Sequence, residues 1–262
     1  MSPFLAQYLT ATSAFFLTGL LFSLAERRWP LRPVDRRRDW GLDVFGFLLS
    51  WHLSSAVVLL GGHVLEAWAP RPSLDGMPGW LRGVAFFLAA DFFKYGVHAL
   101  MHTRWLWPVH RFHHSAEQLW WFSGNRASVG HVVLHFLPTA ALGWLLDAPP
   151  SWVMANAGLN ILWNHVMHVN VAWPASAQRA FEWLLVTPRY HHVHHARAPE
   201  LSGRNLASVL TVWDHLFGTA VRPERMAEGT PFGLEEPLPS LARLAVGVEG
   251  ARTQQPRELP PT

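Results

Sequence analysis

The sequence contains no cysteine, a single lysine and few charged residues overall. Without cysteine the chain can form neither disulfides nor thiolate metal sites nor cysteine-bound iron–sulfur clusters. It also lacks a glycine-rich dinucleotide fingerprint and any cytochrome-like segment. No interior Ser/Gly-rich or strongly charged linker divides the 262 residues, which favours one domain without its own electron-transfer module.

Apolar residues are abundant: 50% of the chain is hydrophobic, only 15% is charged, and there are 15 tryptophans. This composition is typical of a membrane protein rather than a soluble enzyme. The segment from Arg27 to Arg38 holds six arginines between two apolar runs. A loop retained at the cytoplasmic face explains that position better than a nucleic-acid site does, so we expect no nucleic-acid partner.

Long apolar runs predict the membrane segments. Residues 4–24 can cross a hydrocarbon core about 30 Å thick, and residues 44–69 form a second run. A third run begins near residue 80. Two shorter runs, 131–146 and 152–168, predict a tilted hairpin or a re-entrant pair.

The predicted fold is therefore an all-α integral membrane protein with about four transmembrane or re-entrant helices and a cytoplasmic, histidine-rich helical cap. Alternating crossings from a cytoplasmic arginine loop place every histidine cluster on the cytoplasmic side. We expect residues 1–221 to form one membrane-embedded domain. Residues 222–262, rich in Pro, Glu and Arg, are expected to form a surface extension that ends in a loose tail after residue 250.

Three histidine clusters dominate the sequence. Positions i, i+3 and i+4 share one face of an α-helix, so each cluster can aim its imidazoles at a common point. Imidazole nitrogen suits iron, zinc, copper or nickel better than magnesium or calcium. Eight histidines exceed the three or four protein ligands of a typical zinc site, which favours two metals. The clusters are His98 with His102; His110 with His113 and His114; and His191 with His194 and His195.

Five of the histidines outside these clusters are isolated on apolar segments or near the end of the chain's motifs. An isolated histidine is usually a hydrogen-bonded residue of the protein core, so we expect that role rather than metal ligation for each of them. They are His52, His63, His131, His135 and His215.

The motifs around the clusters, read in order, resemble the fatty acid hydroxylase and sterol desaturase superfamily of membrane di-iron oxygenases. The resemblance covers about residues 89–219 and is closest to the alkylglycerol monooxygenase branch. The motifs that carry it are DFFKYGVHALMH from Asp91, HRFHHS from His110, HVN from His168, TPRYHHVHH from Thr187, RNL from Arg204 and WDHLFGT from Trp213.

The resemblance implies two iron ions, which zinc can replace in preparations, and O2 as co-substrate. It also implies hydroxylation or desaturation of a lipid C–H bond in a fatty acyl, sterol or ether lipid. Carried over by position, the metal ligands are His98, His102, His110, His113, His114, His168, His191, His194 and His195.

The sequence departs from the family pattern at two places. Ala99 replaces the arginine of the usual H-R-x-x-H, and Asn164 stands where some relatives have a further histidine. Asn164 and the adjacent His165 are therefore alternative candidates for an additional ligand.

Three polar residues also match family positions. We expect Asp91 and Asp214 to orient ligating imidazoles, because such histidines usually donate their second nitrogen to a carboxylate or carbonyl. The alternatives are that Asp214 pins a loop and that Asn205 makes a turn.

The chemistry implies several partners. A membrane lipid would enter from the bilayer, past Trp120, Trp121, Phe122 and Trp163 unless these are interface anchors or core residues. Electrons would come from a separate reductase, ferredoxin or cytochrome, and the expected location is a bacterial inner membrane. Two alternatives remain: a membrane metal-binding protein without oxygenase activity, and a b-type haem electron carrier that uses histidines such as His52 or His63.

Overall fold

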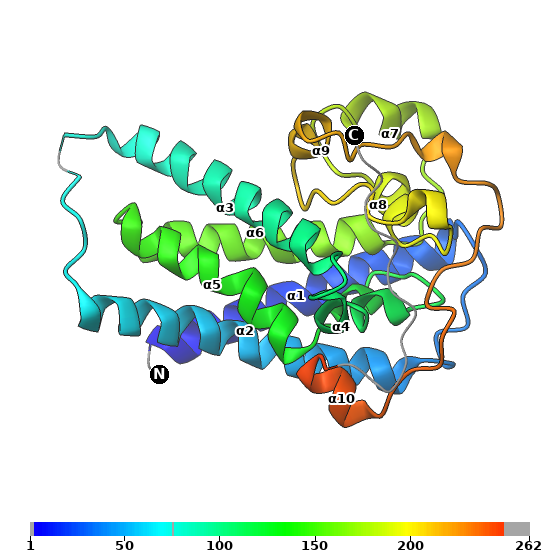
Figure 1. The fold of residues 1–262 in the computed structure, drawn as a ribbon, viewed down its shortest axis with the longest axis horizontal. Coiled ribbons are helices and arrows are strands. Elements are labelled where there is room, and N and C mark those ends of the chain that lie inside the picture. Colours follow the sequence, from blue (N-terminus) through cyan, green and yellow to red (C-terminus); the bar gives the residue numbers. More distant parts are fainter. Residues whose placement is uncertain (1–2, 75, 249–262) are drawn as a thin grey trace.

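The computed structural model describes residues 3–74 and 76–248, and the predicted loose tail lies outside them. Five long helices form the body of the molecule (Figure 1). Within the described residues the fold is entirely helical, with isolated bridges instead of strands, which confirms the predicted all-α class. The five helices are α1 (Pro3–Arg28), α2 (Trp40–Trp68), α3 (Gly79–Met101), α5 (Val129–Leu145) and α6 (Pro150–His168).

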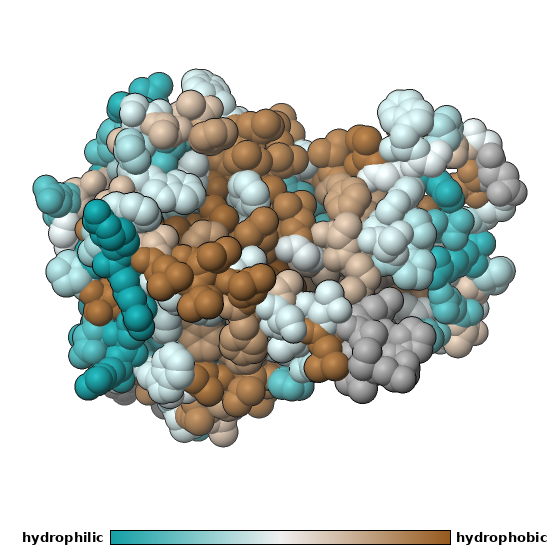
Figure 2. Space-filling view, turned by 180° about the vertical axis from the view of Figure 1, so that it is seen from behind, coloured by the Kyte–Doolittle hydropathy of each residue, from teal (hydrophilic) through white to brown (hydrophobic). Residues whose placement is uncertain are grey.

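Three of these helices, α1 from Tyr8 onward, α2 and α3, are long and apolar enough to cross a membrane. The α5 helix is also apolar but has only 17 residues. Large apolar side chains on α1 and α2, such as Leu17, Leu21 and Leu60, are more than half exposed. Figure 2 shows apolar side chains covering the middle of one face, with hydrophilic ones gathered toward its ends. A surface of this kind is suited to lipid, as the composition predicts.

The long helices lie side by side and have two distinct ends (Figure 1). The α5 helix packs against α2 and α3, and α6 packs against α1 and against the short helix α8 (Pro188–His194). At one end of the bundle, the turn after α2 meets the turn after α5. The Arg71 guanidinium donates to the Ala148 carbonyl (3.3 Å), and the Arg82 guanidinium at the start of α3 donates to the Asp147 carboxylate (3.0 Å).

The other end of the bundle carries the loop of residues 29–39 and the short helices, which together we call the cap (Figure 1). Because the arginine-rich loop and the histidine motifs share this end, they lie on the same side of any membrane that the helices cross. The short α-helices are α4 (Trp107–His110), α7 (Ala175–Phe181), α8 (Pro188–His194), α9 (Val212–Leu216) and α10 (Leu241–Val246). Single 3₁₀ turns lie at His113–Ser115, Ser123–Asn125, Pro199–Leu201 and Pro223–Arg225.

The C-terminal segment packs back onto the cap. Phe232 is buried with Ala116 and Leu119, and Leu244 of α10 is also buried. The Arg111 guanidinium donates to the Val248 carbonyl (2.7 Å). Residues 222–248 therefore share apolar contacts with the motif-bearing part of the chain.

The aromatic run at residues 120–122 lies in the core rather than at a headgroup interface. Trp120, Trp121 and Phe122 are at most 7% exposed and pack with Phe15 and Phe47. Of the alternatives that the sequence left open for this run, the structure supports the core position, because the run folds inward between α1 and α2. Its position is fixed by polar contacts from the same helices, including donation from the Trp120 indole to the Asp43 carboxylate (3.0 Å).

Candidate metal centre

The structure brings all nine histidines of the predicted ligand set together as two adjacent groups. Within each group, one nitrogen per histidine lies within 4.8 Å of the corresponding atoms of the others, and every member is buried. We call them the five-histidine group (His98, His102, His110, His114, His194) and the four-histidine group (His113, His168, His191, His195).

The expectation that each sequence cluster points to one place is wrong for both His-x-x-His-His motifs. In each motif the first and last histidines, four residues apart, enter the same group, whereas the middle one enters the other. His113 thus leaves His110 and His114, and His194 leaves His191 and His195. Each motif therefore spans both groups and fixes their spacing through its own backbone.

The Nε2 atoms converge within each group. The Nε2 atoms of His98 and His114 lie 2.9 and 3.2 Å from that of His110. In the four-histidine group, the Nε2 atoms of His168 and His195 lie 3.2 and 3.0 Å from that of His191. Nitrogens that bind one ion at about 2.1 Å have separations of this order.

Backbone carbonyls hold the opposite ring nitrogens. Nδ1 of His98 lies 2.7 Å from the Leu206 carbonyl, and Nδ1 of His168 lies 2.8 Å from the Asn164 carbonyl. Nδ1 of His194 lies 2.9 Å from the carbonyl of Arg204. A hydrogen on Nδ1 leaves the Nε2 lone pair free for a metal.

Burial keeps these imidazoles neutral. Removal from water, and then the neighbouring imidazoles, lower the pKa of seven histidines of the two groups well below the ordinary value of 6.5: His102, His110, His113, His114, His191, His194 and His195. Neutral imidazole is the form that binds metal. In addition, Nε2 of His102 and of His194 is buried without a hydrogen-bond partner among the described residues. The donor set therefore fits nitrogen-binding transition metals.

An elongated cavity of about 290 Å³ reaches the histidines from the helix bundle. His98, His110, His113 and His191 line its inner end, and residues of α1, α2, α3, α5 and α6 line the rest together with residues outside these helices, such as Asn125 and Ser208. Trp163 is the one predicted path residue that lines it, whereas Trp120, Trp121 and Phe122 do not. The cavity is mainly apolar in its lining, so it can hold a hydrocarbon chain against the histidine groups.

Comparisons with known proteins agree with this geometry. The family model for fatty acid hydroxylase matches residues 83–219, which contain all nine histidines. The chain belongs to the fatty acid hydroxylase family. This confirms the resemblance drawn from the motifs.

Three related proteins whose names state an activity align with the chain. Alkylglycerol monooxygenase from Xenopus tropicalis is 30% identical over 62% of this chain, and the human one is 32% identical over 58%. The chain covers only 35% and 33% of the length of these two proteins. Ornithine lipid hydroxylase from Rhizobium tropici is 29% identical over 80% of the chain and 67% of its own length. No solved structure gave a significant match.

The Thr-Pro pair that opens the motif TPRYHHVHH has a local structural role. Thr187 caps α8, because its hydroxyl accepts from the Tyr190 amide (3.3 Å), and Pro188 occupies the first turn. Both residue types favour helix starts. The TP pair of the fatty acid hydroxylase motif therefore starts the helix that places His191 and His195 one turn apart.

Asp91 and Asp214 contact no imidazole. The Asp214 carboxylate accepts from the amides of Leu206 and Ala207 (2.7 and 3.0 Å), and that of Asp91 accepts from the Val209 amide (3.2 Å). The predicted direct orientation of ligands is thus wrong. Both carboxylates hold the loop whose Leu206 carbonyl faces His98, so their effect on the ligand is indirect.

Asn205 makes a turn, as the alternative prediction states. Its backbone has φ of 54°, a conformation that asparagine tolerates better than most residues. Its side chain donates to the Tyr190 carbonyl (2.9 Å) and accepts from the Val221 amide (2.7 Å).

The alternative ligands Asn164 and His165 have different surroundings. Asn164 contacts the four-histidine group through its backbone carbonyl, and its side chain lines the cavity. His165 is outside both groups, and its Nδ1 lies 3.0 Å from the Thr18 hydroxyl.

Sequence reasoning missed the role of His131. Its Nδ1 lies 3.3 Å from Nδ1 of His110, so it is the polar neighbour of a residue in the five-histidine group. His131 lies one turn before His135 on α5, and this i, i+4 pair next to a histidine centre was an available signal. The other outlying histidines, His52, His63 and His215, are exposed rather than in the core.

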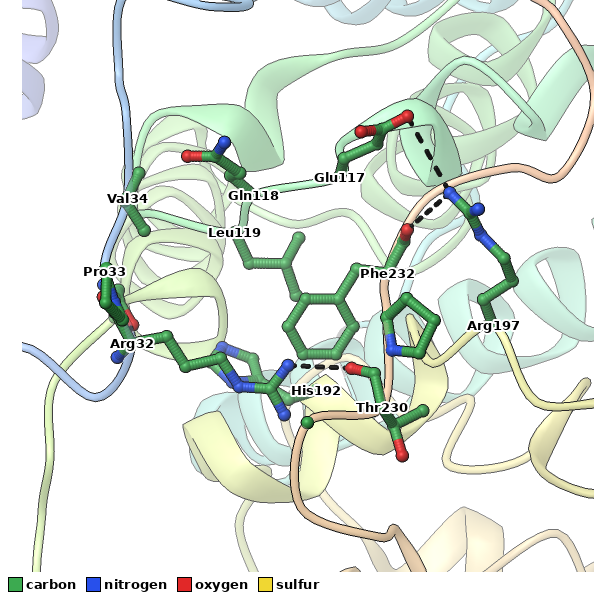
Figure 3. A pocket seen from close by; sticks show the side chains of 13 residues that line it. Arg32, Pro33, Val34, Glu117, Gln118, Leu119, His192, Arg197, Thr230 and Phe232 are labelled. Atoms are coloured by element: carbon green, nitrogen blue, oxygen red, sulfur yellow. Dashed lines mark hydrogen bonds and ion pairs between the residues drawn. The ribbon is translucent and has the colours of Figure 1, made fainter.

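A second cavity of about 210 Å³ lies on the outer side of α8 (Figure 3). His192 faces it, with its ring 5.6 Å from that of Phe232. The Arg32 guanidinium crosses the cavity and donates to the Thr230 carbonyl (2.8 Å). His192 is thus turned away from both histidine groups although three ligand candidates, His191, His194 and His195, surround it in sequence.

Proposed function

We propose that the protein is a membrane-bound di-iron oxygenase that hydroxylates or desaturates a C–H bond of a lipid. The observation that carries this proposal is the pair of neutral histidine groups at the inner end of an apolar cavity. Because the chain spans about a third of the matched alkylglycerol monooxygenases, their activity is a guide to the reaction class only.

The two histidine groups would each hold one iron, with all nine histidines as ligands. Bound iron supplies the activation of O2, which side chains alone cannot provide. The protein holds the Nε2 atoms in place through carbonyls such as those of Leu206 and Asn164, and its burial of the groups excludes water. The cavity would keep the hydrocarbon chain extended toward the histidines, so that one carbon is presented to the centre.

The cap would lie on the cytoplasmic side of a bacterial inner membrane. Support comes from the six arginines between Arg27 and Arg38, which share the cap end, whereas Arg71 and Arg82 at the opposite end contact the Asp147 carboxylate. Lipid would enter from the bilayer between the long helices, and a separate reductase, ferredoxin or cytochrome would deliver electrons at the cap. Residues 1–221 would form the membrane-embedded domain, with residues 222–262 as its surface extension.

The test is to purify the protein with iron, count metal ions per chain, and follow O2-dependent conversion of membrane lipids with a chemical reductant and ferredoxin. We expect two irons and a product whose mass is changed by one added oxygen or two lost hydrogens. A stable two-iron protein that converts no lipid with any reductant would contradict the oxygenase proposal.

The same preparation separates the alternatives. A Soret band would indicate a b-type haem carrier, for which His52 and His63 are poor candidates because both are exposed. Zinc analysis alone decides nothing, because zinc can occupy iron sites during expression. Reconstitution with iron after chelation should restore lipid conversion, whereas a non-catalytic metal-binding protein would bind iron and remain inactive.

A further inference from the structure

The only lysine of the chain lies inside the helix bundle. Lys94 is on α3, four residues or about one helical turn before His98, and is 2% exposed. Side chains four residues apart share a helix face, about 6 Å apart along its axis. Both Lys94 and His98 line the long cavity. An ionisable side chain at this depth in a membrane protein is expensive and commonly functional.

Lys94 has no hydrogen-bond or ion-pair partner among the residues that the structure describes. The phenyl ring of Phe136 lies 5.3 Å from its ammonium nitrogen. Asp91 attracts it electrostatically, but the carboxylate oxygens of Asp91 already accept from the Val209 and Leu210 amides and the Trp213 indole. The amine is therefore available to a molecule in the cavity.

A second polar atom without a partner in the described part of the chain belongs to another residue of the cavity lining. His135 of α5 also lines it, and its Nδ1 is buried without a partner among the described residues. The ring of Phe136, the residue that follows His135 on α5, lies 5.3 Å from the Lys94 nitrogen, and all three residues line the cavity. The cavity lining includes neither aspartate nor glutamate, so no carboxylate of the lining competes with an acidic ligand for Lys94.

We propose that Lys94 binds the carboxylate of an acidic lipid, with His135 as a second hydrogen-bond partner. An ammonium donating to a carboxylate makes a stronger contact than one donating to a neutral oxygen. Anchoring the acid one helical turn from His98 places carbons near the carboxyl end, rather than the chain terminus, beside the histidine groups. The inference about which carbon is oxidised rests on the proposed function, whereas the inference that the acid binds does not.

The test compares three lipids with the same chain: palmitic acid, hexadecan-1-ol and methyl palmitate. Binding to the full-length protein in nanodiscs is measured as purified and after chelation, because a carboxylate could also bind a metal. We expect palmitic acid to bind about tenfold more tightly than either neutral lipid in both states. Lys94→Met should remove this preference, and Lys94→Arg should retain much of it.

Ser54→Ala is the matched control, because Ser54 lines the same cavity but donates only to the Trp51 carbonyl of its own helix. It should keep the preference for the acid. Equal binding of the three lipids, or a preference that survives Lys94→Met, would overturn the inference.

Chemical labelling provides a measurement that does not depend on a variant folding. Because the chain has one lysine, an apolar amine-reactive ester modifies one side chain, which peptide mass spectrometry distinguishes from the N-terminal amine. Palmitic acid should protect Lys94 from labelling, and methyl palmitate should not. Unchanged labelling at saturating acid would overturn the inference. Failure of O2-dependent turnover would instead count against the proposed function and leave these results unaffected.

Discussion

The two histidine groups differ in the parts of the fold that hold them. In the five-histidine group, His98 and His194 face the carbonyls of Leu206 and Arg204, which belong to one loop of the cap. In the four-histidine group, His168 faces a carbonyl of its own helix α6. His113 faces the Arg126 carbonyl at 3.3 Å.

These supports have separate anchors. The cap loop is held by the Asp214 and Asp91 carboxylates through amides of residues 206–210. Arg126 is fixed by a buried ion pair with Asp43 of α2, at 2.6 Å. The difference teaches that the two groups can be disturbed independently through their supports, although the His-x-x-His-His motifs join them covalently.

Removing one ligand from each group should have the largest effect. We expect His98→Ala and His191→Ala each to lower lipid conversion by more than about 100-fold. Loss of only the hydrogen-bond partner of a ligating histidine already costs about 10–100-fold in metal affinity or activity, and these variants lose the ligand itself. His191→Ala leaves three histidines in its group and His98→Ala leaves four, so the former should lose its metal more completely. Metal per chain and conversion rate measure both effects.

The control for these variants is His52→Ala, since His52 is an exposed histidine outside both groups. It should retain metal and activity. If His98→Ala and His191→Ala both kept two metals per chain, the assignment of ligands to the groups would be wrong.

A glycine substitution should disturb only the four-histidine group. A methyl group at Gly124 would clash with the His168 ring, whereas one at Gly158 on α6 would meet open space. We expect Gly124→Ala to weaken metal binding in that group by about 10–100-fold, the range for losses of ligand orientation. Gly158→Ala should leave metal binding unchanged. Chelator titration should show one weakened metal and one unchanged metal in Gly124→Ala, and equal weakening of both would contradict independent supports.

Sequence patterns predicted the long helices and the eight clustered histidines because both depend on local spacing, whereas His168 was added by the resemblance to the family. Runs of apolar residues approximate α1, α2 and α3, and all nine histidines enter one or the other of the two groups. The division into groups was not predictable in this way. His113 and His114 are adjacent in sequence but enter different groups, because a 3₁₀ turn at residues 113–115 follows α4 and the partners come from α6 and α8.

The carbonyl supports were also hidden from the sequence. Every residue has a backbone carbonyl, so the residue types at positions 206 and 126 do not indicate that the carbonyls of Leu206 and Arg126 face imidazoles. For the same reason Asp91 and Asp214 were expected to contact histidines directly. Conversely, the inward packing of Trp120 reflects contacts with α1 and α2 that lie about 80 to 100 residues earlier in the chain.

The smallest effect that we expect is on the pH dependence of the free energy of unfolding. It tests α8, which supplies histidines to both groups. Burial lowers the pKa of His192 to about 3, with the charges of His168 and Arg32 as further causes. The unfolded chain takes up a proton on this imidazole near pH 6.5. Between these values only the unfolded state is protonated there, so stability falls as pH decreases, by at most about 1.4 kcal/mol per pH unit. Above pH 6.5 this contribution is constant.

His192→Leu should remove that dependence while leaving the two histidine groups in place, because the His192 ring faces the outer cavity. Thermal unfolding of the chelated protein in detergent should therefore separate wild type from variant progressively between pH 7.5 and pH 5. The variant should gain in relative stability at the acid end, and metal content at pH 7.5 should be equal in both. Parallel pH profiles would show that His192 is not held neutral by burial, and a loss of one metal would mean that α8 cannot be altered on its outer face without moving His191 or His195.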